Sequence, residues 1–224
     1  MNKTVIGIAI TLFLSGNANI FAYDTIKYVR KGYILNLVNK DKTLDERALN
    51  NLIDTYFIVY PVLVRNFNEE AVREVAFFID PDYSGIAESG GGKIRINPKW
   101  LKDHSDDFDI ITHEVMHLVQ DYPPGTGPWW ITEGIADYVR YVYGVDNEKG
   151  GWYLPDYSED QNYDNGYRVT ARFFLWIENR IRPGFIKQLD HVMRANIYSE
   201  GFWGRQTGMT LQELWDVYGK NPAI

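Results

Sequence analysis

Hydrophobic and polar positions along the chain predict a strand-rich first part. Short apolar or alternating runs bounded by turn residues indicate strands, and they are Tyr33–Val38, Val75–Ile79, Ile86–Glu88 and Lys93–Ile96. The string TLDE, in which Glu46 follows three residues after Thr43, has capping-box spacing and predicts the start of a helix. Apolar residues then recur at helical spacing as far as Tyr60, and Pro61 predicts a kink or an end there.

Helical patterns dominate the second part of the chain. The predicted helices span residues 105–120, 128–144, 167–181 and 185–194, and a last one follows a cap at Thr210. The polar and aromatic stretch 146–165 shows no period, which predicts a long loop or a mobile flap. Strands that precede a run of helices are typical of an α+β fold. We therefore expect a small N-terminal mixed β-sheet followed by a mainly helical part.

Size and charge exclude several classes of protein. A chain of 224 residues is long enough for one domain with a sizeable core, and we expect residues 23–224 to form it. The formal net charge is −7 and no basic run occurs, which argues against binding to nucleic acid or to an anionic membrane. Aromatic residues make up 15% of the chain, which indicates a large core plus an aromatic-lined surface or cleft; a tyrosine-rich surface without a ligand is an equal alternative.

The first 22 residues have the pattern of a secretory signal peptide. Lys3 precedes the apolar run Val5–Leu14, which is too short to span a bilayer, and small residues follow. We expect cleavage after Ala22, with Ala18 as the alternative, and export to the periplasm or the cell exterior; an uncleaved anchor is the other interpretation. The chain has no cysteine, which excludes a lipid attached through an N-terminal cysteine.

The stretch ITHEVMHLVQ, residues 111–120, is the strongest chemical signal. His113 and His117 are four residues apart, so on a helix both imidazoles lie on one face and can bind one metal ion. Glu114 is rotated by about 100° from His113, where a carboxylate can hold a water molecule without binding the metal. Zinc lowers the pKa of a bound water to about 7, and Glu114 would act as the general base. A chance pair of histidines on a surface helix is the alternative.

A catalytic zinc site needs a third protein ligand, and the stretch WWITEGIADYV offers a candidate. Glu133 and Asp137 are four residues apart among apolar neighbours, so one carboxylate can bind the metal while the other orients a ligand histidine. A solvated helix face is the alternative. Gly134 would let the two motif-bearing helices approach closely. His104 and His191 are poorly placed along the sequence, and we interpret them as surface or core residues.

These two motifs resemble those of the gluzincin zinc peptidases, in which a glutamate on a later helix is the third ligand. The segments HEVMHLVQ, WWITEGIADYVR, TARFFLWIE and LQELWDVYGK are also similar to the basic secretory protein family of plants and bacteria. The resemblance covers nearly the whole chain after Tyr33, although this chain is acidic. It implies a zincin-like fold with Zn²⁺ as cofactor. It also implies roles for five residues: His113, His117 and Glu133 as ligands, Glu114 as base and Asp137 as support.

The residues expected to contact the substrate lie in the segments before and after the helix that carries His113 and His117. In zincins the edge strand before that helix lies along the substrate, so we expect Lys93, Ile94, Arg95 and Ile96 to bind a peptide by strand pairing. Gly90, Gly91 and Gly92 would let its backbone come close; an ordinary turn is the alternative. The tetrahedral oxyanion needs a donor besides the metal, and Tyr167 is the first candidate. Tyr163 and Tyr157 are alternatives.

The sequence thus predicts a secreted zinc metallopeptidase acting on a peptide or protein substrate. A second hypothesis is a non-catalytic zincin whose aromatic cleft binds a glycan or a protein. Glu114 favours the enzyme, since a structural zinc site usually has no general base beside its ligands. A zinc hydrolase of a non-peptide bond is a third possibility.

Overall fold

A computed structural model describes residues 24–224, so the expected signal peptide lies outside the described residues. Five strands form one sheet in the order β1-β2-β3-β5-β4. Their bounds are Thr25–Arg30 (β1), Tyr33–Asn39 (β2), Glu74–Ile79 (β3), Ala87–Gly90 (β4) and Lys93–Ile96 (β5). The pairs β1–β2 and β4–β5 are antiparallel and the pairs β2–β3 and β3–β5 are parallel. The mixed sheet is therefore confirmed.

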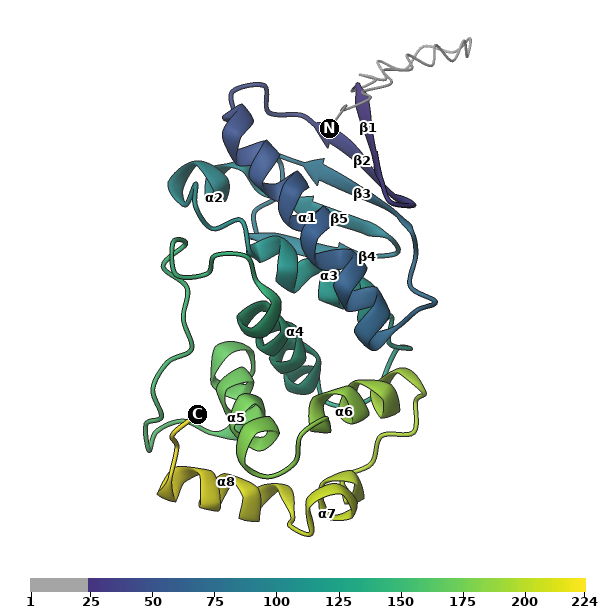
Figure 1. The fold of residues 1–224 in the computed structure, drawn as a ribbon. Helices are drawn as coiled ribbons and strands as arrows, with labels where there is room; N and C mark the ends of the chain where they lie inside the picture. Colours follow the sequence, from purple (N-terminus) through teal and green to yellow (C-terminus); the bar gives the residue numbers. More distant parts are fainter. Residues whose placement is uncertain (1–23) are drawn as a thin grey trace.

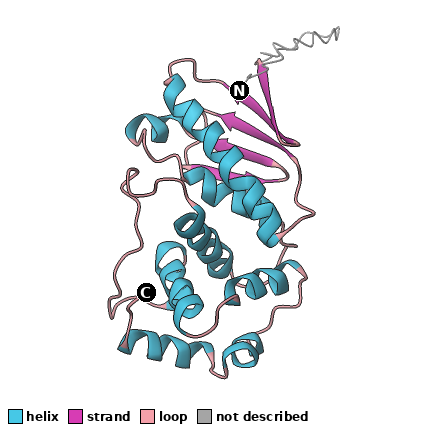
Figure 2. Cartoon of the chain, viewed as in Figure 1, coloured by secondary structure: helices cyan, strands magenta, loops and turns pink. Residues whose placement is uncertain are grey.

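The first helices lie against one face of the sheet, and the later helices form a separate layer (Figure 1). Their bounds are Glu46–Phe67 (α1), Pro98–Asp103 (α2), Ile110–Gln120 (α3), Trp129–Tyr143 (α4), Tyr167–Arg180 (α5), Phe185–Arg194 (α6), Gly201–Thr207 (α7) and Leu211–Lys220 (α8), with a 3₁₀ turn η1 at Tyr163–Asn165. Helices α1 and α3 pack side by side, and α3 contacts β4 and β5. Figure 2 shows the strands at one end of the molecule and the later helices at the other. This arrangement confirms the α+β, zincin-like fold class.

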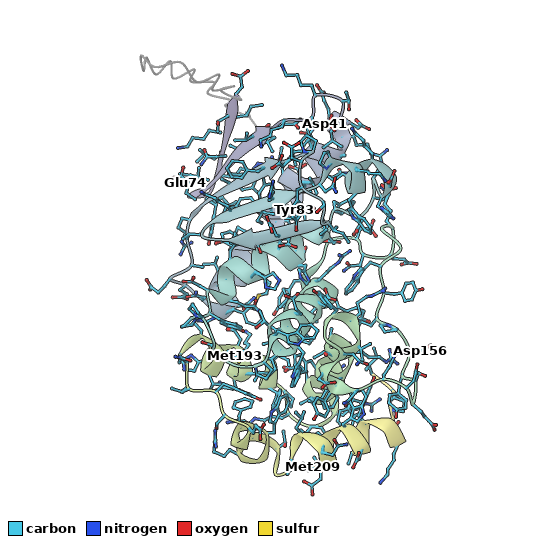
Figure 3. All side chains as sticks on the ribbon, turned by 180° about the vertical axis from the view of Figure 1, so that it is seen from behind. Asp41, Glu74, Tyr83, Asp156, Met193 and Met209 are labelled. Carbon is cyan, nitrogen blue, oxygen red and sulfur yellow. The ribbon has the colours of Figure 1, made fainter. Side chains whose placement is uncertain are left out.

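A continuous hydrophobic core joins the sheet to the helices. Alternation in β5 turns Ile94 and Ile96 toward the helices, where both are fully buried. Figure 3 shows the side chains from behind, with Tyr83 at the sheet and Met193 and Met209 in the helical part. None of the helices in residues 24–224 is both long enough and apolar enough to cross a membrane.

Helix α1 departs from its sequence prediction at both ends. Its N-cap is Asp45, whose side chain accepts a hydrogen bond from the backbone of Arg47, whereas the Thr43 hydroxyl donates to Asp41 instead. The helix also continues six residues beyond Pro61. An interior proline costs about 3 kcal/mol. Tertiary packing offsets that cost here, because Leu63 and Val64, just after the proline, are buried in the core.

The predicted edge strand is wrong. Strand β5 (Lys93–Ile96) lies inside the sheet, paired with β3 on one side and with β4 on the other, and β4 forms the edge. Gly91 and Gly92 both have positive φ and make a two-residue hairpin turn between the two strands, as a type I′ turn requires. The tight turn folds the short β4 back onto β5. The Gly-rich segment is therefore a turn, although it also lines the cleft described below.

Candidate metal centre and cleft

The two motif helices, α3 and α4, run antiparallel and hold the candidate site between them. Gln120 at the end of α3 contacts Thr132 near the start of α4, and Asp109 before α3 contacts the backbone of Val145 after α4. Gly134 does not serve this contact, contrary to expectation. A Cβ atom there would lie 2.3 Å from Thr170, so Gly134 lets α5 approach α4.

The structure brings His113, His117 and Glu133 together. Nε2 of His113 lies 3.0 Å from Nε2 of His117, and Oε2 of Glu133 lies 3.2 Å and 3.5 Å from these two nitrogens. One ligand atom from each residue lies within 4.8 Å of the others, which is compatible with a metal site. Two imidazoles and one carboxylate form the donor set of the His₂Glu zinc sites.

The outer nitrogen of each histidine is held by a side chain. Nδ1 of His113 lies 2.6 Å from Oδ1 of Asp137, which is buried one helical turn after Glu133. Nδ1 of His117 lies 2.7 Å from Oε1 of Gln120, whose amide nitrogen donates to the backbone oxygen of Thr132. Both contacts leave the Nε2 atom of each histidine directed at the centre of the His113–His117–Glu133 cluster. Sequence reasoning missed Gln120. Its position three residues after His117, on the same helix face, was the available signal.

The charge around the cluster favours a cation. Burial alone would lower the pKa of His113, but hydrogen bonds to Asp137 and Glu133 outweigh burial and raise its pKa to about 10. Burial alone would raise the pKa of Glu133, and its hydrogen bonds with His113 and His117 lower it instead. Because carboxylates surround the imidazoles, positive charge is stabilised at this point. A divalent cation would supply that charge.

Glu114 has no hydrogen-bond partner for one of its oxygens. Its side chain is buried, 6% exposed, and Oε2 is an orphaned acceptor on the wall of the cleft beside the two histidines. A buried polar atom without a partner is uncommon and calls for an explanation. The same carboxylate contributes to the raised pKa of His113 through its charge, so it lies close to the cluster. This orphaned oxygen, together with the donor set, fits a centre that holds a metal ion and a water molecule.

Tyr167 lies beside His113 at the cleft. Its ring lies parallel to the ring of His113, with 6.4 Å between centroids and 16° between planes, and it is half exposed at the cleft. Burial, followed by the charges of Glu133, Asp137 and Glu114, raises the pKa of Tyr167. The backbone of Tyr167 has φ of 47°, which a bulky residue rarely adopts.

The alternative tyrosines lie elsewhere. Tyr163 packs against Trp130 and Trp215, and Tyr157 packs against Trp215 and Tyr218. Neither is among the described residues that line the cleft.

The cluster opens into a cleft of about 1160 Å³. Its walls come from the β4–β5 hairpin, the end of α2, α3, one face of α4, the long loop after α4 and the start of α5. His104 lies at this wall but is stacked on Trp100, away from the cluster, and His191 lies on α6 outside the cleft. Neither belongs to the His113–His117–Glu133 group, and their interpretation as surface or core residues stays a prediction.

Strand β4, not β5, presents the free sheet edge to the cleft. The backbone of Asn97 donates to the oxygen of Ile86, so with the observed register Glu88 and Gly90 also turn their backbone groups toward β5. Ala87 and Ser89 then turn theirs outward. Four residues were expected to contact the substrate, and two of them, Ile94 and Ile96, are buried. Arg95 is ion-paired with Asp80 and Glu88, and Lys93 is exposed outside the cleft.

Fold and cluster together define a zincin-like fold that carries a His113–His117–Glu133 cluster compatible with a metal site. The structure matches an M1 zinc metallopeptidase from Deinococcus radiodurans with a TM-score of 0.51 and 13% identity, over 86% of this chain and 49% of that one. It matches a mutant two-domain M1 zinc metallopeptidase bound to L-tryptophan with a TM-score of 0.50 and 12% identity, over 88% of this chain and 51% of that one. The chain thus spans about half the length of these proteins, and the likeness shows the fold.

The sequence also identifies the family. The family model BSP, described as "Peptidase of plants and bacteria", matches residues 37–218, so the chain belongs to this family. The resemblance inferred from the motifs is therefore confirmed. No curated protein matches the sequence.

Proposed function

We propose that the protein is a zinc-dependent metallopeptidase that hydrolyses peptide bonds in peptide or protein substrates. The observation that carries this proposal is the orphaned, buried oxygen of Glu114 beside the His113–His117–Glu133 cluster in an open cleft. A structural zinc site is closed by four protein ligands, whereas this cluster offers three and leaves room on the cleft side. Family membership and the zincin-like fold support the same class.

Three of the chain's side chains would hold the ion, and two would keep the histidines in place. His113, His117 and Glu133 would bind Zn²⁺, with Asp137 and Gln120 fixing the imidazoles. When bound, zinc supplies a Lewis acid that polarises the substrate carbonyl and acidifies water.

Glu114 and Tyr167 would carry out proton transfer and stabilise the oxyanion. The Glu114 carboxylate takes a proton from the attacking water and delivers it to the leaving amine. The Tyr167 hydroxyl, at the cleft beside His113, donates a hydrogen bond to the oxyanion that develops on the carbonyl. Burial of Glu114 keeps bulk water away from its carboxylate. The substrate backbone would pair with the outward groups of β4 in place of the predicted β5.

Measurement of bound metal and of peptide cleavage on the same preparations tests the proposal. The wild type should carry about one zinc per chain and cleave peptides of a diverse library, read by mass spectrometry. Glu114→Gln should keep the zinc and lose about 10²- to 10⁴-fold in kcat. Zinc binding without cleavage by the wild type would contradict the peptidase and favour a binding protein or a non-peptide substrate. Loss of zinc from Glu114→Gln would instead make Glu114 a ligand.

We also propose that the protein acts after export, with residues 1–22 removed and residues 23–224 folded as one domain. The support is the signal-like pattern of the N-terminus. The intact mass of protein collected from the periplasm or the medium checks this, because cleavage after Ala22 leaves Tyr23 as the first residue. A full-length mass in the membrane fraction would contradict it.

A further inference from the structure

The wall of the cleft carries an aromatic cluster that has no role in the proposed hydrolysis. The rings of Trp100 and His104 are stacked, with 3.8 Å between centroids and 17° between planes. Nε1 of Trp100 donates to Oδ2 of Asp107 over 3.1 Å, and the other oxygen of Asp107 is ion-paired with Arg140. The guanidinium of Arg140 in turn lies over the ring of Trp152, 4.4 Å from its centroid. All five residues line the cleft that contains the metal cluster.

These contacts assemble residues from four separate segments. Trp100 and His104 belong to α2 and its C-cap, Asp107 to the turn before α3, Arg140 to α4 and Trp152 to the long loop. Helix α2 and that loop lie on the same side of the molecule, left in Figure 1. Asp107 and Arg140 are buried, at 6% and 5% exposure, while both tryptophans remain partly exposed. A buried ion pair thus holds two aromatic rings at the cleft wall.

The buried polar groups of this cluster, Asp107 and Arg140, are already engaged with one another and with neighbouring side chains. Both oxygens of Asp107 have partners, and Nε of Arg140 donates to Asn147 over 3.0 Å. A site for sugars needs hydrogen-bond partners for hydroxyl groups as well as a ring to stack on. Apart from Nε2 of the exposed His104, this wall offers mainly aromatic surface, and the apolar side chain of Ile110 lines the same cleft. The surface therefore suits an apolar planar group better than a polyhydroxylated one.

We propose that the wall of the cleft formed by Trp100, His104 and Trp152 is a specificity subsite for a large aromatic side chain of the substrate. This inference rests on the proposed function, because the subsite shares one continuous cleft with the His113–His117–Glu133 cluster. Binding of a remote side chain there would position the scissile bond at Glu114. The subsite determines which peptides are cleaved and takes no part in the chemical step.

The test compares pairs of peptides that differ only by phenylalanine or alanine at one position near the scissile bond. For the wild type, the ratio of kcat/KM values, phenylalanine over alanine, should reach about tenfold or more at one position. In Trp152→Ala and in His104→Ala that ratio should fall to a few-fold or less. A partly unfolded variant does not disturb the result, because the fraction of active enzyme cancels in the ratio. An unchanged ratio in both variants overturns the proposal.

Tyr153→Ala is the matched control. Tyr153 is the next residue in the same loop, is 67% exposed and is not among the residues that line the cleft. Its removal should leave the phenylalanine-over-alanine ratio at the wild-type value. A fall equal to that of Trp152→Ala would mean that the loop as a whole, and not the ring of Trp152, sets the preference, and it would overturn the assignment.

A binding measurement separates this inference from the proposed function. If the wild type cleaves nothing, saturation-transfer NMR with N-acetylphenylalaninamide, N-acetylalaninamide and a glucose hexasaccharide still tests the subsite. The phenylalanine derivative should give the strongest signal, and Trp152→Ala should reduce that signal several-fold. That result keeps the aromatic subsite although the peptidase proposal has failed. A signal from the hexasaccharide alone, or from none of the three, overturns the subsite.

Discussion

The side-chain oxygen of Gln120 lies 2.7 Å from Nδ1 of His117, and the amide nitrogen of the same side chain donates to the backbone oxygen of Thr132. Gln120 therefore connects the second histidine of the HExxH helix to the start of the helix that carries Glu133. Asp137, on α4, orients His113 on α3 in the same way, through its contact with Nδ1. Each histidine is thus oriented by a side chain, and each of these two side chains also forms a contact between α3 and α4.

Replacement of Gln120 should weaken metal binding. Gln120→Leu removes the acceptor for Nδ1 of His117, so the imidazole can rotate, and zinc affinity should fall about 10- to 100-fold. Gln120→Glu keeps an acceptor and should retain most of the affinity. Gln188→Leu, on an exposed position of α6, is the control and should bind zinc like the wild type. Competition with a chromogenic chelator measures all four proteins, and equal affinities for Gln120→Leu and the wild type would rule out this role.

Asp109 should contribute to stability through three hydrogen bonds. Its carboxylate accepts from the Thr112 hydroxyl and from the backbone of Val145 and Asp146, and so ties the turn after α4 to the start of α3. Asp109→Ala leaves these donors without a partner, which should lower the free energy of unfolding by about 2–4 kcal/mol. Urea denaturation measures the change.

Asp146→Ala is the control for the same contact. It keeps the backbone N–H that donates to Asp109. It removes an exposed side chain and its long, exposed hydrogen bond of 3.3 Å from the backbone of Lys149, so its unfolding free energy should stay within about 0.5 kcal/mol of the wild type. Equal losses in the two variants would show that the carboxylate of Asp109 does not anchor the turn.

The metal-free protein should lose stability as the pH rises above neutrality. The pKa of His113 is raised from 6.5 to about 10, because bonds to Asp137 and Glu133 outweigh burial. A folded-state pKa above the unfolded value gives stability that is complete below about pH 6.5 and is lost as the pH rises toward 10. Urea denaturation in a chelator should therefore show a decline on the order of a few kcal/mol over this interval.

The variant Asp137→Asn checks the origin of that decline. It removes the carboxylate that contributes most to the raised pKa of His113, so the decline between pH 6.5 and 10 should become smaller. Zinc should reverse the trend in the wild type, since the metal binds the deprotonated imidazole and its affinity rises with pH. A metal-free wild type whose stability does not change over this interval would contradict the assigned shift.

The parts of the site that could be predicted are those whose residues lie close together in the sequence. His113, Glu114 and His117 follow from spacing within one helix, and Glu133 and Asp137 from the same spacing within another. Thr210 and Glu213 form the capping box that their spacing predicts. The packing of the two motif helices against each other was also predictable, because the ligands of one metal ion are divided between them.

Contacts between segments that lie far apart in the sequence could not be predicted from residue spacing. The sequence predicts a strand at Ile86–Glu88, but this short pattern does not show that β4 folds back through the Gly91–Gly92 turn and pairs with Lys93–Ile96. Pro61 predicts a kink or an end of the helix, and the end is wrong because local propensity omits the core that α1 packs against. The cluster around Trp152 joins four segments by single contacts, and no periodicity encodes such an arrangement.

The new position of the edge strand leads to a prediction about substrate binding. The register of β4 against β5 turns the backbone N–H and C=O of Ser89 away from the sheet, toward the cleft. Ala87 also faces outward, but its oxygen already accepts the hydroxyl of Tyr83. Ser89 is therefore the residue of β4 with both backbone groups free for an extended peptide.

Ser89→Pro should impair cleavage without unfolding the protein. Proline removes an N–H that takes no part in the β4–β5 ladder, and edge strands tolerate proline at such positions. Loss of one backbone hydrogen bond to the substrate should lower kcat/KM about tenfold for peptides long enough to reach β4. Ser89→Ala keeps the N–H, removes only a buried hydroxyl without a partner, and should cleave like the wild type. If Ser89→Pro binds zinc and cleaves long peptides at the wild-type rate, the substrate does not pair with β4, and the cleft must hold it by side-chain contacts alone.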